Sequence, residues 1–447
     1  MSNREAVYRA RWILPVSSEP LSEGAVRVTA DGLIDAVGAA KEVPVDGARV
    51  FELGDAIILP GLVNVHAHPE LTCLRGRLED LEFTRWIEML TELKYDVLSA
   101  EALRVSTWLG IAEAVASGVT CVAAPDDAGF LMRAMVESGL RGRVYREVFG
   151  PSPDQADEAL AEIVAKVEAA RPLQNDRVEV GISPHAPYTV SASLFGKLAE
   201  YALTEGLPVC IHAAESEAEE SFVRRGTGPF AERLRARKIE VRPNSLSPIS
   251  WLSGTGILAT RPLLVHCVRA DSSDIACIAD HGASIAHCPI SNAKLGHGVA
   301  PLADFMEANI AVGLGSDSVA SNNRMDILEE GRFAALLQRS VRRDATVVSP
   351  RDLLRLATLE GARALGLGDG IGSLQPGKRA DMAAVRVDLP RSMPTRDPVT
   401  ALFHSASAAD VILTVVGGQV LYRDGEFTTI DWTALADDVQ TKRFGAE

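Results

Sequence analysis

The chain has 447 residues, and its 60 acidic and 45 basic side chains give a formal net charge of −15. Such a charge repels nucleic acid phosphates and anionic membrane surfaces, so we expect neither a nucleic acid nor a membrane partner. Hydrophobic residues make up 47% and charged residues 23%, as in ordinary globular proteins. The length predicts one large domain and a smaller one.

The N-terminal residues MSNREAVYRA lack the apolar core of a signal peptide, and no uncharged apolar run is long enough to span a bilayer. We therefore expect a cytoplasmic protein. The six cysteines include no C-x-x-C pair and lie mostly in apolar runs. This pattern favours buried thiols over disulfides or a zinc knuckle.

Eight short apolar runs alternate with longer amphipathic stretches between about residue 60 and residue 365. Such alternation is typical of βα units around a parallel sheet. The runs are LVNVHAH, VTCVAAPD, RVYREVF, VEVGISPH, PVCIHAAE, PLLVHCV, ASIAHCPIS and AVGLGSD. Helices are predicted between them, for example over 193–204 and over 271–280, where Asp271 is a suitable cap. The pattern predicts an α/β fold, a (β/α)8 TIM barrel, over residues 59–373.

Two further segments lie outside this repeat. Residues 69–95 are too long for a simple βα loop, and long loops at that end of a barrel tend to be lids or substrate walls. Residues 1–58 and 374–447 hold short alternating strands with Gly and Asp at the turns. We expect these two terminal segments to form one small β-sandwich domain.

Histidines and an aspartate stand at the carboxyl ends of the predicted strands. His66 and His68 are two residues apart in a strand, so both face the barrel interior. His212, His266 and Asp317 end three other strands, at the face where barrels place their active sites. Neutral imidazole is a good ligand for zinc, iron and nickel, and the convergence of these residues predicts a metal site.

Glu215 follows His212 by three residues, close enough to sit beside a metal and shuttle protons. The neighbouring Glu217, Glu219 and Glu220 are expected to be solvated loop acids. The sequence has no H-E-x-x-H, no cytidine-deaminase zinc motif, no G-x-S-x-G elbow and no P-loop. The classes of enzyme that depend on those motifs are excluded.

Several segments together resemble the amidohydrolase superfamily, in particular its deaminase and chlorohydrolase branch. They are ILPGLVNVHAH, LRG, SPHAPYTVS, IHAAES, VHC, HCPISNAKLGHGVAPL, GLGSDSVASNN and GSLQPGKRADM, and they span nearly the whole chain. The resemblance implies that the ligands of the metal are His66, His68, His212 and Asp317. It also implies that Glu215 and His266, with Asp317, act on water and substrate.

No lysine ends the fourth predicted strand, where binuclear relatives place a bridging carboxylated lysine, so one divalent ion is expected. Zn²⁺ is favoured over Fe²⁺. By resemblance, a metal-bound hydroxide attacks the amino-bearing carbon of a nitrogen heterocycle, Glu215 moves a proton to the ring, and ammonia leaves. A homodimer is also implied.

The sequence indicates the identity of the substrate less closely than it indicates the reaction. The resemblance implies that His185 contacts the substrate, and Glu70, Arg146 and Glu147 are further candidates, although the last two could form a structural ion pair. Adenosine-type relatives place a ribose-gripping glutamate about nine residues after the equivalent of Trp86, but that position here is near Tyr95. The segments HPELTCLRG, EFTRWIEML and YREVFGPSP resemble the subgroup that contains aminodeoxyfutalosine deaminases.

Alternatives stay open at this point. Fold similarity does not choose between deamination, dechlorination and another C–N hydrolysis such as the opening of an amide ring, nor between purine, nucleoside, guanine, pterin and triazine substrates. A non-catalytic structural relative is a remote alternative. Bound metal in the purified protein would separate that alternative from an enzyme.

Overall fold

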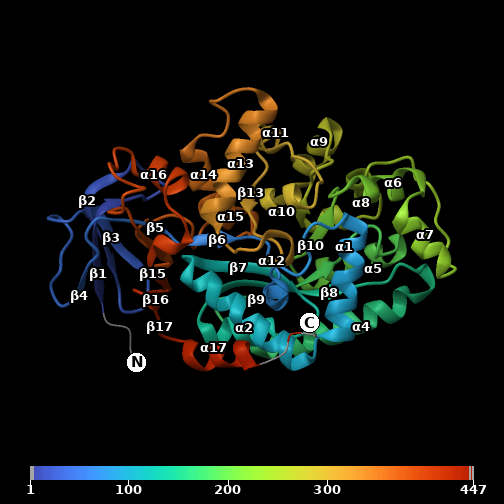
Figure 1. Ribbon diagram of the computed structural model, residues 1–447, viewed down its shortest axis with the longest axis horizontal. Coiled ribbons are helices and arrows are strands. Elements are labelled where there is room, and N and C mark those ends of the chain that lie inside the picture. Colours follow the sequence, from blue (N-terminus) through green and yellow to red (C-terminus); the bar gives the residue numbers. More distant parts are fainter. Residues whose placement is uncertain (1–4, 442–443, 445–447) are drawn as a thin grey trace.

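The structure is a computed structural model that describes residues 5–441 and residue 444. Its larger part contains eight short parallel strands in two four-stranded sheets (Figure 1). The first sheet has β6 (Leu62–Asn64), β7 (Val119–Asp126), β8 (Arg141–Val148) and β9 (Val178–Pro184). The second sheet has β10 (Cys210–Ala213), β11 (Leu263–His266), β12 (Ser284–His287) and β13 (Val312–Leu314). The fold is therefore α/β, with the eight strands in the order the sequence predicts.

Parallel bridges join the two sheets at both seams. Ile182 bridges to Val209 at one seam, and Ala67 bridges to Asp317 at the other. At the second seam the Val65 amide also donates to the Leu314 carbonyl at 3.0 Å. The carboxyl ends of β6 and β13 therefore lie side by side.

Helices follow the strands in alternation and cover their outer faces (Figure 1). The longer ones are α2 (Ala100–Ala116), α4 (Ala156–Ala170), α5 (Ala192–Glu205), α9 (Ser272–His281) and α13 (Ile327–Arg342). The shorter ones up to β14 are α3 (Leu131–Ser138), α6 (Glu217–Arg225), α7 (Pro229–Ala236), α8 (Pro248–Gly254), α10 (Pro289–Lys294), α11 (Leu302–Glu307), α12 (Val319–Asn322), α14 (Pro350–Leu356) and α15 (Leu359–Ala364). In the described part of the chain, no helix is long and apolar enough to cross a membrane.

Local sequence signals set the ends of the two helices predicted individually. Ser191 accepts the Leu194 amide at the start of α5, and Gly206 ends that helix in a left-handed conformation with φ 64°. Asp271 caps α9 and forms a reciprocal capping box with Asp274. Such caps satisfy amides and carbonyls that a helix leaves without partners. Both predicted helices are confirmed.

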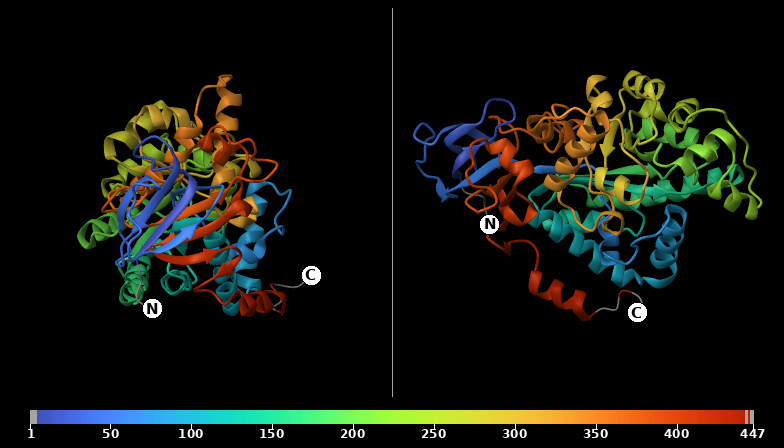
Figure 2. Two further views of the ribbon diagram at one scale, coloured as in Figure 1. Left: turned by 90° about the vertical axis from the view of Figure 1, so that its left-hand side faces the viewer. Right: turned by 45° about the horizontal axis from the view of Figure 1, so that its top comes forward.

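The terminal segments meet in a single sheet (Figure 2). Its strands are β1 (Ala6–Ile13), β2 (Leu21–Val28), β3 (Ile34–Ala39), β4 (Arg49–Glu52) and β5 (Ala56–Pro60) from the N-terminal side, with β14 (Met382–Arg386), β15 (Val411–Val416), β16 (Gln419–Arg423) and β17 (Glu426–Phe427) from the C-terminal side. The sequence predicts a β-sandwich here, and the structure shows that its two halves are hydrogen-bonded into one sheet, with buried residues of both halves in one core. β5 pairs with β1 on one edge and β14 on the other, so it joins both halves into one nine-stranded sheet.

The helices of the C-terminal segment lie on the larger part of the molecule. α16 (Pro398–His404) packs against α13 and α14, and α17 (Trp432–Thr441) packs against α2. All six cysteines are free, and four of them are buried, as the sequence predicts; Cys73 and Cys277 are partly exposed.

Candidate metal centre

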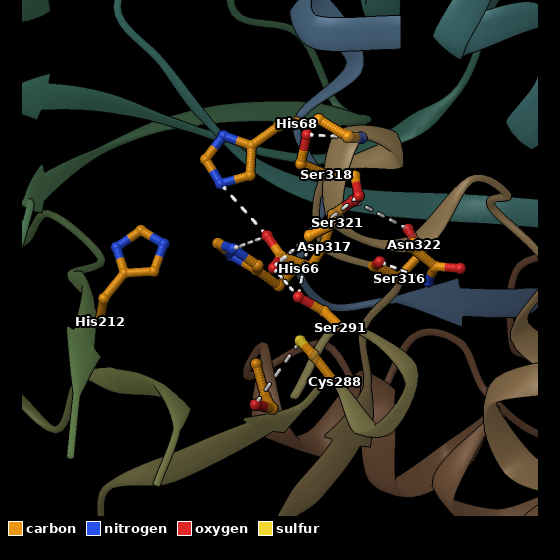
Figure 3. A network of polar contacts seen from close by, with 12 residues as sticks. His66, His68, His212, Cys288, Ser291, Ser316, Asp317, Ser318, Ser321 and Asn322 are labelled. Carbon is orange, nitrogen blue, oxygen red and sulfur yellow. Dashed lines mark hydrogen bonds and ion pairs between the residues drawn. The ribbon is translucent and has the colours of Figure 1, made fainter. Parts of the chain in front are cut away.

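Two histidines and an aspartate meet where the ends of β6 and β13 lie side by side (Figure 3). The Asp317 amide donates to the His66 carbonyl at 2.9 Å, so the two chain segments are joined directly beside the site. The Asp317 carboxylate places Oδ1 3.4 Å from His66 Nε2 and 3.6 Å from His68 Nε2. His66, His68 and Asp317 therefore present three ligand atoms to one another.

His212 and His266, from the ends of β10 and β11, come to the same place. One ring nitrogen from each of His66, His212 and His266 lies within 4.8 Å of the other two. The His212 Nδ1 lies 3.0 Å from the His185 carbonyl oxygen, which accepts its proton. That contact leaves the other nitrogen of His212, Nε2, as the lone-pair donor facing the cluster.

The chemistry of this cluster fits a divalent metal ion. Within the described residues, both ring nitrogens of His66 and Nδ1 of His68 are buried without a hydrogen-bond partner. Burial lowers the pKa of His66 to about 4 and the pKa of His212 well below its ordinary value, so both imidazoles are neutral, as metal ligands must be. Burial alone would raise the pKa of Asp317, but His66 and His266 bring it well below its ordinary value. Three imidazoles and a carboxylate are a donor set that zinc and iron accept.

Hydroxyl groups hold the second oxygen of the Asp317 carboxylate. Ser291 Oγ donates to Oδ2 at 2.5 Å, and Ser321 Oγ donates to it at 3.1 Å (Figure 3). Because Oδ2 is occupied, Oδ1 is the oxygen left to face the histidines. Such outer contacts orient a ligand and fix its charge.

Glu215 lies beside the cluster, between two histidines. Its Oε1 is 3.6 Å from His266 Nε2 and 3.3 Å from His297 Nε2. Burial raises the pKa of Glu215, but His266 and His297 outweigh this effect and lower it. His266 is itself held by Asn292, whose Oδ1 lies 2.9 Å from Nδ1. A buried carboxylate beside a metal cluster is placed to carry protons.

Glu219 corrects one expectation from the sequence. It is fully buried and not solvated: its carboxylate accepts the amides of Ala214 at 2.9 Å and Glu215 at 2.8 Å. Ala214 has φ 51°, a left-handed conformation that leaves this turn short of backbone partners. Glu219 supplies them from the first turn of α6, while Glu217 is exposed as expected. The sequence pattern did not distinguish these two acids because both lie in one polar run.

A cavity of about 700 Å³ opens from the cluster and is lined by His68, His212, Glu215, His266 and Asp317. Its side walls are aromatic. Phe83 and Trp86, from α1 (Phe83–Glu92) within the predicted wall segment, line it together with Tyr188 and Phe230, and the Phe83 and Phe230 rings meet edge to face. The rings of Tyr188 and Phe230 stack with centroids 3.9 Å apart. Flat apolar walls above a polar floor suit a planar heterocycle.

The structure separates the four predicted substrate contacts. His185 and Glu147 line the cavity, whereas Glu70 and Arg146 do not. Glu70 instead lies 3.6 Å from His68 Nδ1, behind the cluster. Arg146 pairs with Asp126 at 2.6 Å, so it forms the structural ion pair that the sequence left open, although not with Glu147. Burial lowers the pKa of His185 to about 3, so this ring is neutral.

Sequence reasoning missed several residues of the site. Ser291, Asn292 and His297 lie within the segment HCPISNAKLGHGVAPL, but none ends a strand, so the strand-end criterion passed over them. Lys94 lines the cavity and is buried, and nothing in its local sequence signals burial. Phe230 lies on α7, 18 residues after His212, the preceding predicted strand end used for the site.

Comparison with known proteins places this arrangement in a family. The amidohydrolase family matches residues 57–421. A 5-methylthioadenosine/S-adenosylhomocysteine deaminase of Moorella thermoacetica is 33% identical over 437 residues, which cover 96% of this chain and 97% of the relative. The chain belongs to the amidohydrolase family. It is a hydrolase that acts on carbon–nitrogen bonds.

Two solved structures share the fold. An adenosine deaminase from Xanthomonas campestris with bound zinc superposes with a TM-score of 0.85 at 29% identity, over 97% of each chain. The aminofutalosine deaminase of Helicobacter pylori superposes with a TM-score of 0.79 at 21% identity, over 93% of this chain and 99% of the other. The second likeness shows the fold alone.

Proposed function

We propose that this protein is a metal-dependent hydrolytic deaminase of nucleoside-like substrates that carry an amino group on a nitrogen heterocycle. The observation that supports this most directly is Glu215, a buried carboxylate between His266 and His297, facing both the metal cluster and the cavity. The names of the relatives agree with this reaction. The aromatic walls suit the heterocycle.

His66, His68, His212 and Asp317 are proposed to hold one divalent ion, with zinc favoured because of the three imidazole donors. Such an ion, when bound, lowers the pKa of water toward neutrality. Asp317, whose Oδ1 faces the histidines because the serines hold Oδ2, would also orient the attacking water together with His266. Glu215 takes a proton from that water.

The oxygen of water bonds to the amino-bearing ring carbon while Glu215 delivers the first proton to the adjacent ring nitrogen. The second proton of water passes to the amino group, the carbon–nitrogen bond breaks, and ammonia leaves. His185 is neutral, so its ring can contact the heterocycle without adding charge.

The finer architecture is part of the same proposal. The bridges at both seams support a closed (β/α)8 barrel over residues 59–373, with residues 1–58 and 374–447 as the small domain. Size-exclusion chromatography would test the expected homodimer. The cytoplasmic location stays a prediction of the sequence.

The test is ammonia release by zinc-loaded protein from adenosine, 5′-modified adenosines, aminodeoxyfutalosine, guanine, pterins and aminotriazines. We expect release from the nucleosides, lowered about 10²- to 10⁴-fold in Glu215→Gln, as for loss of a general acid–base group. Glu217→Gln, a matched change of an exposed glutamate two residues away, should retain activity. Chloride release from chlorotriazines without ammonia from any nucleoside would favour the dechlorinating alternative and contradict the proposal.

A further inference from the structure

The loop that follows α10 carries a histidine, His297, that is not part of the metal cluster. His297 stands between Gly296 and Gly298, whose φ angles are 73° and 107°. Glycine adopts such angles without the steric cost that they impose on other residues. The His297 amide donates to the Asn292 carbonyl at 2.9 Å, so the loop folds back on the end of α10. This backbone turns the His297 side chain inward, where it is only 4% exposed.

One nitrogen of the His297 ring is buried beside the proposed catalytic glutamate. Within the described residues, no hydrogen bond of good geometry reaches its Nε2, although Glu215 Oε1 lies 3.3 Å away. Leaving a buried polar nitrogen without a partner costs free energy. Catalytic hydrogen bonds are often poorly aligned before substrate binds and tighten in the complex. A small change in the orientation of the ring or of the carboxylate therefore lets Nε2 donate to Glu215.

The His297 ring also packs against the aromatic wall of the cavity. The rings of His297 and Phe83 meet edge to face, with their centroids 4.3 Å apart. Phe83 lines the cavity, whereas His297 is not among the described residues that do. Edge-to-face contacts of this kind fix the position of a ring. His297 is therefore held beside Glu215 at a place where it does not touch a bound substrate.

We propose that His297 is a positioning residue for Glu215, which donates from Nε2 to Oε1 and so directs Oε2 toward the attacking water. His266 Nε2 lies 3.6 Å from the same oxygen, so Oε1 is held between two imidazoles. Oε2 is then the oxygen that accepts the proton of water. A carboxylate held in one orientation requires less reorganisation when the proton moves. The inference rests on the proposed deaminase function and adds a residue that acts on its proton-transfer step.

The test compares two variants of similar side-chain length, His297→Met and His297→Gln, on the nucleoside that the enzyme deaminates fastest. The methionine lacks an N–H donor, so kcat should fall about 10- to 100-fold, which is part of the contribution of a general acid–base group. KM should change by less than about threefold, because His297 lies outside the cavity lining. The glutamine amide can donate to Oε1, so His297→Gln should keep kcat within about fivefold of the unaltered enzyme. His404→Met, at a partly exposed histidine that ends α16, is the matched control and should leave kcat unchanged.

Two outcomes would overturn the inference and leave the deaminase proposal standing. One is an unchanged kcat in His297→Met. The other is an equal loss in both variants, which would indicate that His297 only packs against Phe83. Where the methionine variant does not fold, His297→Phe replaces it, since phenylalanine keeps a ring against Phe83 and lacks both nitrogens; the same loss of kcat is expected. Ammonia from no compound with the unaltered protein would instead contradict the proposed function itself, so the two failures are distinguishable.

Discussion

At the scale of single residues, two histidines of the site, His212 and His266, are fixed through the ring nitrogen Nδ1. The His185 carbonyl holds Nδ1 of His212, and Asn292 Oδ1 holds Nδ1 of His266. Each contact selects one tautomer and one ring orientation. The reactive nitrogens are therefore oriented before substrate binds.

Asn292→Ala tests this arrangement at His266. The change removes the acceptor of Nδ1, so the ring can rotate and exchange its proton between nitrogens. We expect kcat/KM for deamination to fall about 10- to 100-fold, with the metal content of the protein unchanged because His266 is not among the proposed ligands. Asn292→Asp, which keeps an oxygen at this position, should recover part of the loss. Equal activity of the alanine variant and the unaltered protein would show that Asn292 does not position His266.

The sequence predicts the residues at strand ends better than the residues that support them. His66, His68, His212, His266 and Asp317 were identified because parallel strands bring their carboxyl ends together. Lys94 and Glu219 were not identified because their burial depends on packing between distant segments. A polar residue in a polar run carries no local sign that the fold will bury it.

At the scale of elements, the turn between β10 and α6 depends on a side chain that closes it. Glu219 accepts two amides of this turn, one of them the amide of Glu215. The helix thus holds the proposed catalytic glutamate through its first turn. Residues 69–95 were predicted only as a long insertion. They contain helix α1, which supplies two aromatic rings to the cavity.

Glu219→Gln should change how stability depends on pH. Burial raises the pKa of Glu219 to about 8 in the folded protein, while an unfolded glutamate titrates near about 4.3. Between these values the folded state keeps a proton that the unfolded state has lost, so this group contributes less to stability as pH rises. Urea unfolding from pH 5 to 8.5 should show that the free energy of unfolding of the variant rises relative to that of the unaltered protein as the pH increases. For the exposed Glu217→Gln control, the difference in free energy of unfolding from the unaltered protein should stay constant over this pH range. A constant difference for Glu219→Gln would contradict the raised pKa.

At the scale of the whole molecule, a buried ion pair joins the two parts. Arg141, at the start of β8, donates from Nε to Asp381 Oδ2 at 2.6 Å and from a terminal nitrogen to Oδ1 at 3.2 Å. Asp381 precedes β14 of the terminal sheet and also accepts the Gly417 amide at 2.7 Å. Short alternating patterns predict strands but do not specify which distant strands pair. The sequence therefore predicted a small β domain but not its single nine-stranded sheet.

Arg141→Met should destabilise the protein by about 3–5 kcal/mol, since it leaves the buried Asp381 carboxylate without its counter-charge. The measurement is urea unfolding at neutral pH. Arg386→Met, which removes an exposed pair with Asp388, should have a much smaller effect, because solvent screens such a pair. Equal effects of the two changes would show that the buried pair does not join the two parts.

The central claim is that the histidine and aspartate cluster supports hydrolytic deamination through a bound metal ion. The most direct measurement is ammonia release from an adenine ribonucleoside by one preparation before chelation, after chelation and after return of one equivalent of zinc. The account predicts that activity is lost with the metal and returns as the stoichiometry approaches one ion per chain. Ammonia release that persists in metal-free protein would contradict it.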